Sequence, residues 1–151
     1  MEYVRVWRRI AAAISKRAAL RRRTALIFDF TCDDHSALNF SSYLRWYPGD
    51  DVVDWWAVNC FSGPLEDPIN GTPSSMPQSP CVAHFVAAAA QRGFPVMIAE
   101  SQPRYIGAQS SKSWSEWFAP LFALLRHPTV KAFSYVDRDC THMSIYKYLL
   151  R

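Results

Sequence analysis

Glu100 is the residue whose type and position point most directly to chemistry. It follows a short apolar stretch, residues 95–99, that has the length and composition of a β-strand. In parallel α/β folds, active sites lie at the carboxyl ends of the strands. A carboxylate at such a position can act as the nucleophile of a glycosidase. The alternative is an ion pair with Arg104 at the start of the following polar loop, and the residues alone leave both interpretations open.

Aromatic side chains lie near the ends of the other predicted strands. A flat ring offers an apolar surface to the C–H face of a sugar, while carboxylates and amides bind its hydroxyl groups. The pattern therefore predicts a carbohydrate-binding surface around Glu100. The candidate substrate-binding residues are Trp46, Phe61, Arg104, Trp114, Tyr135 and Asp137.

The cysteines and histidines form no metal-binding pattern. The four cysteines are far apart and contain no C-x-x-C pair, which argues against a zinc ribbon and against a dithiol redox site. The histidines lack the i, i+4 spacing of helical metal ligands, and the cluster at residues 33–35 is interpreted as a solvated loop. We therefore expect no metal and no other cofactor. We also expect free, buried thiols at Cys32, Cys60, Cys81 and Cys140.

Strand-like and helix-like stretches alternate along the chain. Strands are predicted at residues 25–28, 52–61, 95–99 and 130–136, and helices at the N-terminus and at residues 81–92, 113–126 and 141–150. A long loop is predicted at residues 62–80. Gly93 is expected to end the second helix, a capping box at Ser113 to open the third, and Pro120 to kink it.

Continuous apolar strands that alternate with helices predict a parallel sheet covered by helices. Four such strands fit either a small doubly wound domain or half of a (β/α)₈ barrel, and periodicity does not distinguish the two. A complete barrel usually needs ~250 residues, and this chain has 151. No glycine-rich phosphate-binding motif follows a strand, which argues against a nucleotide-binding fold.

Positive charge is concentrated at the start of the chain. Residues 1–23 contain eight basic residues and one acidic residue, a net charge of +7, whereas the rest of the chain has a net charge of −3. Apolar residues recur there at three- and four-residue steps, which predicts an amphipathic helix with a solvated arginine face. Its expected apolar face consists of Tyr3, Trp7, Ile10, Ile14 and Ala18.

A mitochondrial transit peptide is a second interpretation of this segment, and nucleic-acid binding is a weaker third. No basic and aromatic pattern continues beyond residue 23, and no apolar run approaches the ~18 residues of a membrane span. We therefore expect neither nucleic acid nor a membrane as a partner. Residues 10–14 are too short for the apolar core of a secretory signal, so the location of the protein is left open.

Several segments resemble glycoside hydrolase family 26. WYPGDDVVDWWAVNCFSG, residues 46–63, resembles the family signature W-Y-P-G-D-x-Y-V-D-W-x-G-x-x-x-[FY]. RGFPVMIAESQPR, residues 92–104, is similar to the seventh barrel strand of that family. SWSEWFAPLFALLRHPTVKAFSYVDRD, residues 113–139, resembles the following helix and the eighth strand. Residues 3–20 and 25–30 look like the helix after the fourth strand and the fifth strand.

The resemblance implies an α/β fold, a partial (β/α)₈ TIM barrel made of strands five to eight with their helices. Residues 1–151 would form a single C-terminal half-barrel, with residues 1–23 as a basic outer helix. Members of the family are retaining hydrolases, β-mannanases foremost, and are usually secreted. The resemblance therefore implies cleavage of O-glycosidic bonds in β-mannan-type polysaccharides, with Glu100 as the nucleophile.

This sequence departs from the family at several positions. The family's general acid/base is a Glu that ends the fourth strand, and the matched segments begin after that strand. Because a retaining glycosidase needs two carboxyl groups ~5–5.5 Å apart, we expect little hydrolysis from these 151 residues alone. An Asp-Phe pair beginning at Asp29 replaces the usual Trp-His, and Asp-Arg-Asp beginning at Asp137 replaces Asn-Trp-Asp. Phe61 stands where related barrels often have a Tyr beside the nucleophile.

Three hypotheses follow. The chain is part of a glycosidase with Glu100 as its nucleophile, or it is a non-catalytic relic that binds β-glycans through Trp46, Trp114 and Tyr135. In the third hypothesis, two copies pair through their open outer strands and close an eight-stranded barrel. Such a homodimer would bring acidic residues that follow the last strand of one copy towards Glu100 of the other.

Overall fold

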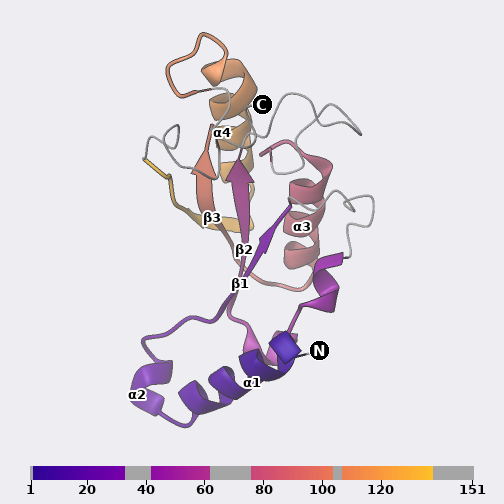
Figure 1. Ribbon diagram of the computed structural model, residues 1–151, viewed down its shortest axis with the longest axis vertical. Helices are drawn as coiled ribbons and strands as arrows, with labels where there is room; N and C mark the ends of the chain where they lie inside the picture. The colour runs from indigo at the N-terminus through magenta and orange to yellow at the C-terminus, as the bar shows by residue number, and fades with distance from the viewer. Residues whose placement is uncertain (1, 33–41, 62–75, 104–106, 138–151) are drawn as a thin grey trace.

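The computed structural model describes residues 2–32, 42–61, 76–103 and 107–137 (Figure 1). Its four strands are β1 (Ile27–Thr31), β2 (Trp55–Phe61), β3 (Val96–Gln102) and β4 (Val130–Phe133). The α-helices are α1 (Glu2–Ser15), α2 (Ala18–Arg21), α3 (Pro80–Gln91) and α4 (Ala119–Leu125). Two 3₁₀ turns, η1 (Ser42–Arg45) and η2 (Asp50–Val52), precede β2, and a π-helical turn, η3 (Trp114–Phe118), leads into α4. The helix expected at residues 141–150 and most of the loop expected at 62–80 lie outside the described residues.

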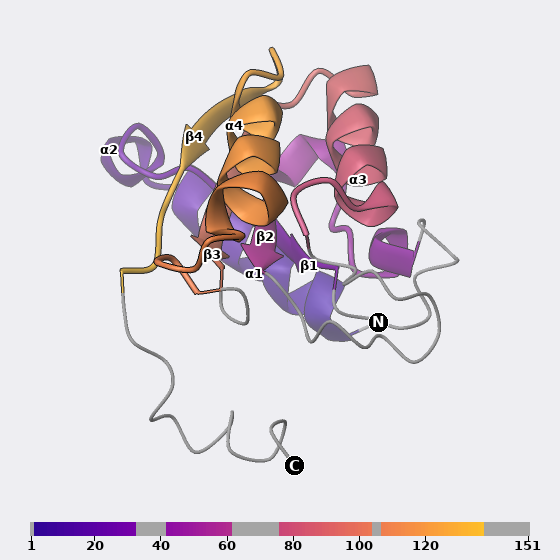
Figure 2. The ribbon, with the colours of Figure 1, turned by 90° about the horizontal axis from the view of Figure 1, so that it is seen from above.

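The four strands form one parallel sheet in the order β1-β2-β3-β4. Helix α3 connects β2 to β3 and α4 connects β3 to β4, and both helices lie on the same side of the sheet (Figure 2). The predicted α/β class, with parallel strands alternating with helices, is therefore confirmed.

The hydrophobic core lies between the sheet and helices α3 and α4. Side chains alternate between the two faces of a strand, so every second strand residue reaches this core. Burial of these apolar side chains is the main force that holds the helices on the sheet. The strands contribute Phe28, Trp56, Val58, Cys60, Val96 and Ile98, and the helical segments contribute Val82, Phe85, Val86, Trp117 and Leu121.

Helix α3 has defined signals at both ends. The Ser79 hydroxyl accepts a hydrogen bond from the backbone N–H of Val82 at 3.3 Å, and Pro80 occupies the first turn. At the other end Gly93 adopts a φ of +78°, a conformation that side chains with a Cβ rarely take. The predicted role of Gly93 in ending this helix is confirmed.

The start of the next helical segment differs from the prediction. Ser113 does not cap it, because its hydroxyl donates instead to the carbonyl of Ser110 at 2.8 Å. The segment opens with the π-helical turn η3, and α4 begins only at Ala119. Pro120 therefore stands in the first turn of α4, where its missing N–H is tolerated, rather than kinking a longer helix.

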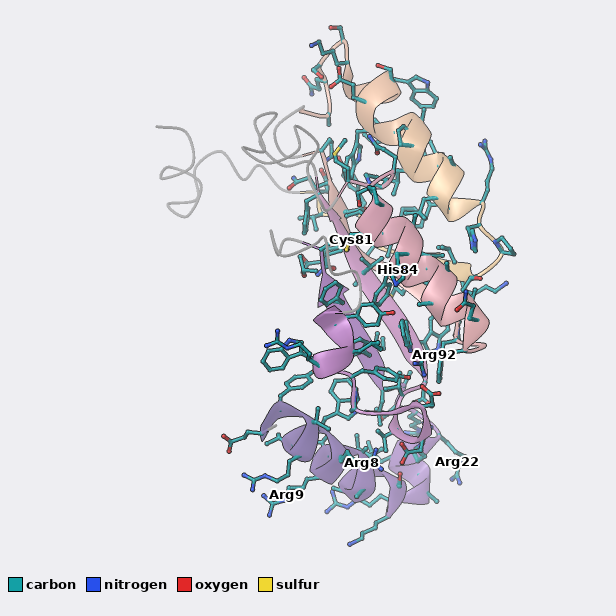
Figure 3. All side chains as sticks on the ribbon, turned by 90° about the vertical axis from the view of Figure 1, so that its right-hand side faces the viewer. Arg8, Arg9, Arg22, Cys81, His84 and Arg92 are labelled. Carbon is teal, nitrogen blue, oxygen red and sulfur yellow. A yellow bond between two sulfur atoms is a disulfide. The ribbon has the colours of Figure 1, made fainter. Side chains whose placement is uncertain are left out.

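Helices α1 and α2 lie at the end of the sheet from which the strands start (Figure 1). Trp7 packs against the core, and its indole N–H donates to the carbonyl of Val52 at 3.1 Å. Arg8 reaches the turn before β2 and donates to Asp51 at 2.9 Å, while Arg9 projects outwards (Figure 3). The predicted apolar face is partly wrong, since Ile10 is 52% exposed. Only one side of α1 meets the rest of the described chain.

A disulfide joins Cys32, which follows β1, to Cys81 in the first turn of α3 (Figure 3). The expectation of free thiols at these two residues is wrong. Their sequence separation is 49, but the fold brings their Cα atoms to 6.1 Å, a normal distance for a disulfide. Cys60 is free and buried, as predicted, and Cys140 lies outside the described residues.

Candidate active site on the sheet

A β-bulge determines the direction of Glu100. Val58 of β2 pairs with Ile98 of β3, but Cys60, two residues later, pairs with Ser101, three residues later. Two residues of β3, Ala99 and Glu100, are thus opposite one residue of β2. Strict alternation along β3 would have aimed Glu100 at the core beside Ile98. The extra residue turns it to the other face of the sheet, and its side chain is exposed.

Polar side chains from three strands gather on the sheet face turned away from α3 and α4. This polar row consists of Asp29 and Thr31 on β1, Asn59 on β2 and Glu100 on β3. Asn59 pairs in register with Thr31 and donates from Nδ2 to the Thr31 hydroxyl at 3.1 Å. The same Nδ2 lies 3.4 Å from Oδ2 of Asp29, to which it also donates. Asn59 therefore connects the β1 residues of the row.

Asp29 and Glu100 interact electrostatically across β2. Partial burial raises the pKa of Asp29 above its ordinary value, and the negative charge of Glu100 raises it further. The hydrogen bond from Asn59 favours the ionised form and acts in the opposite direction. Tyr3 of α1 also lies within electrostatic reach, since its own pKa is raised by burial and by the charge of Asp29.

Asn59 is only 8% exposed, and its two ends differ in their partners. Nδ2 makes the two hydrogen bonds described above, whereas Oδ1 is buried and accepts none from any described residue. A buried polar atom without a partner is unfavourable and requires an explanation. An acceptor left open beside two carboxyl groups fits a site that receives a hydroxyl donor.

An aromatic cluster is formed by side chains of η3 and α4 together with one that follows β4: Trp114, Phe118, Phe122 and Tyr135. The ring of Trp114 contacts Phe122 at 5.9 Å between centroids, and Phe122 contacts Phe118 at 6.4 Å. Phe118 also stacks on Tyr135 at 6.4 Å. Trp114 is 64% exposed, so part of this cluster faces solvent. It offers a flat apolar surface of the kind that sugars bind.

Comparison with known proteins finds sequence and fold similarity to glycoside hydrolases, although no family model matches the sequence. A β-1,3-xylanase from Alcaligenes sp. is 32% identical over 118 residues, covering 62% of this chain and 22% of the xylanase. The structure of GH26C from Muricauda sp. matches with a TM-score of 0.59 at 20% identity, covering 89% of this chain and 35% of GH26C. A GH26 β-mannanase from Bacteroides ovatus matches with a TM-score of 0.50 at 15% identity, covering 74% of this chain and 28% of the mannanase.

The matches to the solved structures decide the fold. The chain has a partial GH26-like fold. Its four parallel strands and their helices correspond to part of a GH26 TIM barrel, and the expected resemblance is confirmed. The chain spans about a fifth of the length of the xylanase and about a third of that of GH26C.

Within this partial GH26-like fold, the predicted site residues occupy three separate places. Glu100 belongs to the polar row, whereas Trp114 and Tyr135 belong to the aromatic cluster. Trp46 is 44% exposed and packs edge-on against Tyr3 of α1, with ring centroids 5.9 Å apart. Trp46 thus lies with the N-terminal helix rather than with the aromatic cluster.

The remaining predicted residues are placed as follows. Phe61 is buried at the end of β2, in register with Gln102. Asp137 is exposed and follows β4. The pKa of Tyr135 is raised mainly by partial burial of its ring and, to a smaller extent, by the negative charge of Asp137. Arg104 lies outside the described residues, so the ion pair with Glu100 that was the alternative interpretation stays untested, and so does the loop cluster at residues 33–35.

Sequence reasoning did not select Asp29, Thr31 or Asn59 as site residues. A signal was present for Asp29, because it is a charged residue in the middle of an apolar strand and replaces an expected aromatic residue. Asn59 interrupts the apolar run of β2 in the same way. Their meeting with Glu100 depends on strand register and on the bulge in β3, which no local pattern encodes.

The described residues contain no group of three or more His, Cys, Asp or Glu side chains that could hold a metal ion. Carboxylate, amide and hydroxyl groups make up the polar row, a set suited to hydrogen bonding with hydroxyl groups. None of the helices in the described ranges has the length and hydrophobicity required to cross a bilayer.

Proposed function

We propose that this chain is part of a glycoside hydrolase that cleaves β-linked glycans by a retaining reaction, with Glu100 as the nucleophile. The observation that carries the proposal is the bulge in β3, which directs Glu100 away from the core near the carboxyl end of a parallel strand. Bulges next to active sites commonly re-aim a side chain in this way. The partial GH26-like fold supports the same class of reaction.

The substrate class proposed is a β-mannan-type polysaccharide. The similar structure from Bacteroides ovatus is a β-mannanase, whereas the similar sequence from Alcaligenes sp. is a β-1,3-xylanase. The two polysaccharides to be compared as substrates are therefore β-mannan and β-1,3-xylan. The polar row offers carboxylate and amide groups for sugar hydroxyls, a feature that both substrates would use.

Covalent labelling of Glu100 tests the proposal. A 2-deoxy-2-fluoro-β-mannosyl or β-xylosyl fluoride has a good leaving group, so it reacts with a nucleophilic carboxylate without help from a general acid. We expect one sugar to be attached to the chain and mass spectrometry of its peptides to find it on Glu100. The sugar that reacts faster identifies the substrate class. Labelling that persists in Glu100→Gln, or no labelling by either sugar, would contradict the proposal.

A second candidate function is glycan binding without catalysis, and the exposed aromatic cluster favours it. Loss of Trp114 would remove the most exposed ring of that cluster. Affinity electrophoresis in gels that contain β-mannan or β-1,3-xylan would measure binding of the protein to each polysaccharide. Retardation that is abolished in Trp114→Ala, together with no labelling of Glu100, would favour binding over hydrolysis.

Pairing of two copies through the sheet edges is proposed as well. β1 and β4 are the edge strands of the described sheet, and Ile27 and Phe133 on them are 36% and 52% exposed. Unpaired edges with exposed apolar side chains favour association with another strand. A homodimer of this kind would extend the sheet towards a closed barrel.

An oxidising location is proposed from the disulfide. Disulfides persist in secreted and extracellular proteins and are rare in the reducing cytosol. The bond between Cys32 and Cys81 is part of the described fold, so the protein is proposed to work outside the cytosol. Thiol labelling of the protein isolated from its natural source tests this, because both thiols would be labelled if the protein matured in a reducing compartment.

A further inference from the structure

We propose that Asn59 recognises a single free hydroxyl group of a glycan, which donates a hydrogen bond to its Oδ1, and that Asp29 positions the amide for this contact. The inference rests on the proposed function, because it takes a β-linked glycan as the ligand of the polar row. It concerns recognition of the substrate and gives Asp29 no part in proton transfer. Asn59 thus helps to determine which glycans the site accepts.

Strand register places Asn59 beside the proposed nucleophile. The β2 residues on either side of Asn59 both pair with β3, whereas Asn59 stands opposite the β-bulge that contains Glu100. The Glu100 side chain is turned to the same face of the sheet. On its other side, Asn59 pairs in register with Thr31 of β1. A glycan bound on this face for attack by Glu100 therefore lies next to Asn59.

The partners of Nδ2 fix the orientation of the Asn59 amide. Nδ2 donates to Oδ2 of Asp29 at 3.4 Å and to the Thr31 hydroxyl at 3.1 Å. An ionised carboxylate can only accept hydrogen bonds. If the amide were turned over, Oδ1 would face the Asp29 carboxylate with no proton between the two oxygens. Asp29 therefore keeps Nδ2 on its own side and leaves Oδ1 as the open acceptor.

The open acceptor is the independent indication that the polar row receives a ligand. Asn59 is 8% exposed, and its Oδ1 is buried and accepts no hydrogen bond from any described residue. Buried polar atoms in folded proteins nearly always have a partner. An asparagine that served packing alone would be expected to have both ends of its amide satisfied. A ligand hydroxyl group supplies the missing donor.

The neighbours of Asn59 leave a path for such a ligand. Asp29 and Glu100, on the strands that flank β2, are both in contact with solvent. The amide of Asn59 thus forms the floor of the polar row between two accessible carboxyl groups. A glycan on this face meets these carboxyl groups first, and a small movement of their side chains lets one hydroxyl group reach Oδ1.

The chemistry of Oδ1 defines what the ligand must offer. An amide oxygen only accepts, so the group that meets it must carry a proton. A free hydroxyl group meets this requirement, whereas a deoxy position or an alkylated or acylated oxygen does not. A ligand without the donor leaves the buried acceptor unpaired, which should weaken binding by about 10–100-fold. The proposed substrate is therefore a β-glycan with a free hydroxyl group at this position.

NMR titration of the nitrogen-15-labelled chain tests the recognition of one hydroxyl group. The probes are methyl β-mannoside and methyl β-xyloside, each compared with its monodeoxy analogues. We expect the parent sugar of the preferred class to shift the side-chain amide signals of Asn59. The analogue that lacks the hydroxyl group at Oδ1 should bind about 10–100-fold more weakly and shift these signals less. A parent sugar that binds without moving the Asn59 signals would overturn the inference.

Asn59→Ala identifies the hydroxyl group that contacts Oδ1. This variant should bind the parent sugar as weakly as the wild type binds the corresponding deoxy analogue, and loss of that hydroxyl group should then weaken its binding no further. A purely structural role of Asn59 would instead weaken binding of all the sugars by the same factor. Circular dichroism checks that the variant is folded, and the comparison of deoxy sugars on the wild type does not depend on any variant.

Asp29→Asn tests the positioning role. The new side-chain amide can donate as well as accept, so the amide of Asn59 is no longer held in one orientation. We expect the preference for the parent sugar over the deoxy analogue to fall towards one. Asp51→Asn is the matched control, since Asp51 is an exposed aspartate that pairs with Arg8 at the opposite end of the sheet. It should keep the wild-type preference.

The outcomes separate this inference from the proposed function. If Glu100 is labelled while Asn59→Ala keeps the wild-type discrimination among deoxy sugars, recognition by Asn59 is wrong and the proposed function stands. An unchanged preference in Asp29→Asn would overturn the positioning role. Discrimination that depends on Asn59 without labelling of Glu100 would support the inference and contradict the proposed hydrolysis. A chain that neither binds these sugars nor is labelled would overturn both.

Discussion

Asn59 links the chemistry of the polar row to its packing at the scale of single residues. Its Nδ2 donates to Asp29 at 3.4 Å, and a donor to a carboxylate stabilises the ionised form. Its Oδ1, by contrast, is buried and accepts no hydrogen bond from any described residue. One side chain therefore adjusts the acidity of Asp29 while it keeps a buried acceptor open.

Substitution Asn59→Ala should raise the pKa of Asp29 further, because the hydrogen bond that lowers it is lost while burial and the charge of Glu100 remain. The free energy of unfolding should change by no more than about 1.5 kcal/mol, since hydrogen bonds worth ~0.5–1.5 kcal/mol are lost together with an unsatisfied atom. NMR titration of Asp29 measures the first effect. Thr31→Val serves as the control, and an unchanged pKa in Asn59→Ala would contradict the role of Asn59.

Cys60 shows how burial alone changes a titration. Desolvation raises the pKa of this thiol from 9.0 to about 12. The folded protein therefore keeps the thiol proton at pH values where the unfolded chain has released it, and stability should be full below pH 9 and decline as the pH rises towards 12. The decline attributable to Cys60 should approach about 1.4 kcal/mol per pH unit. Urea unfolding at a series of pH values measures it, and Cys60→Ala should lack this component.

At the scale of secondary-structure elements, the disulfide connects the two layers of the fold. Cys32 follows β1 and Cys81 begins α3, so the bond ties an edge strand of the described sheet to a helix on the sheet face. Helix α3 is otherwise held there by buried side chains such as Phe85. The bond restricts the unfolded chain more than the folded one.

Removal of the disulfide should destabilise the protein by about 2–5 kcal/mol, with about 4 kcal/mol expected from the entropy of closing a loop of this length. The double variant Cys32→Ala/Cys81→Ala tests this in urea unfolding. A reducing agent should lower the midpoint of the wild type and leave that of the double variant unchanged. Equal midpoints for the oxidised wild type and the double variant would show that the bond does not stabilise the fold.

At the scale of the whole molecule, charge and apolar surface are distributed unequally. The first 23 residues carry a net charge of +7, and part of that charge is paired with Asp51 and Asp54 beside the start of β2. The same helical segment exposes Tyr3, Val6 and Ile10 at 40–52%. These exposed apolar side chains lie at the end of the sheet where the strands start. Together with the open sheet edges, they favour association with another protein molecule.

The 151-residue chain should accordingly self-associate at micromolar concentrations. Sedimentation velocity over a range of concentrations measures this, and the mean sedimentation coefficient should rise with concentration. Phe133→Lys, on the exposed side of edge strand β4, should shift the distribution towards the monomer without loss of helical circular dichroism. A single monomeric boundary at all concentrations would rule out the proposed pairing of edges.

Local patterns were sufficient for the order and class of the elements. Apolar runs such as the one around Val58 and the helix signals at Gly93 act over a few residues, so they can be recognised in isolation. The resemblance to glycoside hydrolase family 26 came from the same kind of local information, and the solved structures support the fold it implied. The capping pattern at Ser113 did not predict the π-helical turn before Pro120. Such a pattern contains no information on the carbonyl of Ser110, to which the Ser113 hydroxyl donates instead.

Contacts between distant residues were decided only in the tertiary structure. The sequence alone determined that Glu100 follows an apolar strand, but ordinary alternation would have buried it, and the bulge against Asn59 reversed its direction. The spacing of Cys32 and Cys81 gave no sign of a bond that depends on the packing of α3 against β1. Strand register and the bulge place Asp29 and Glu100 on the same face of the sheet, and register is set by the sum of many weak contacts along the sheet. The sequence therefore determined which residues could do chemistry, and the tertiary structure decided which of them meet.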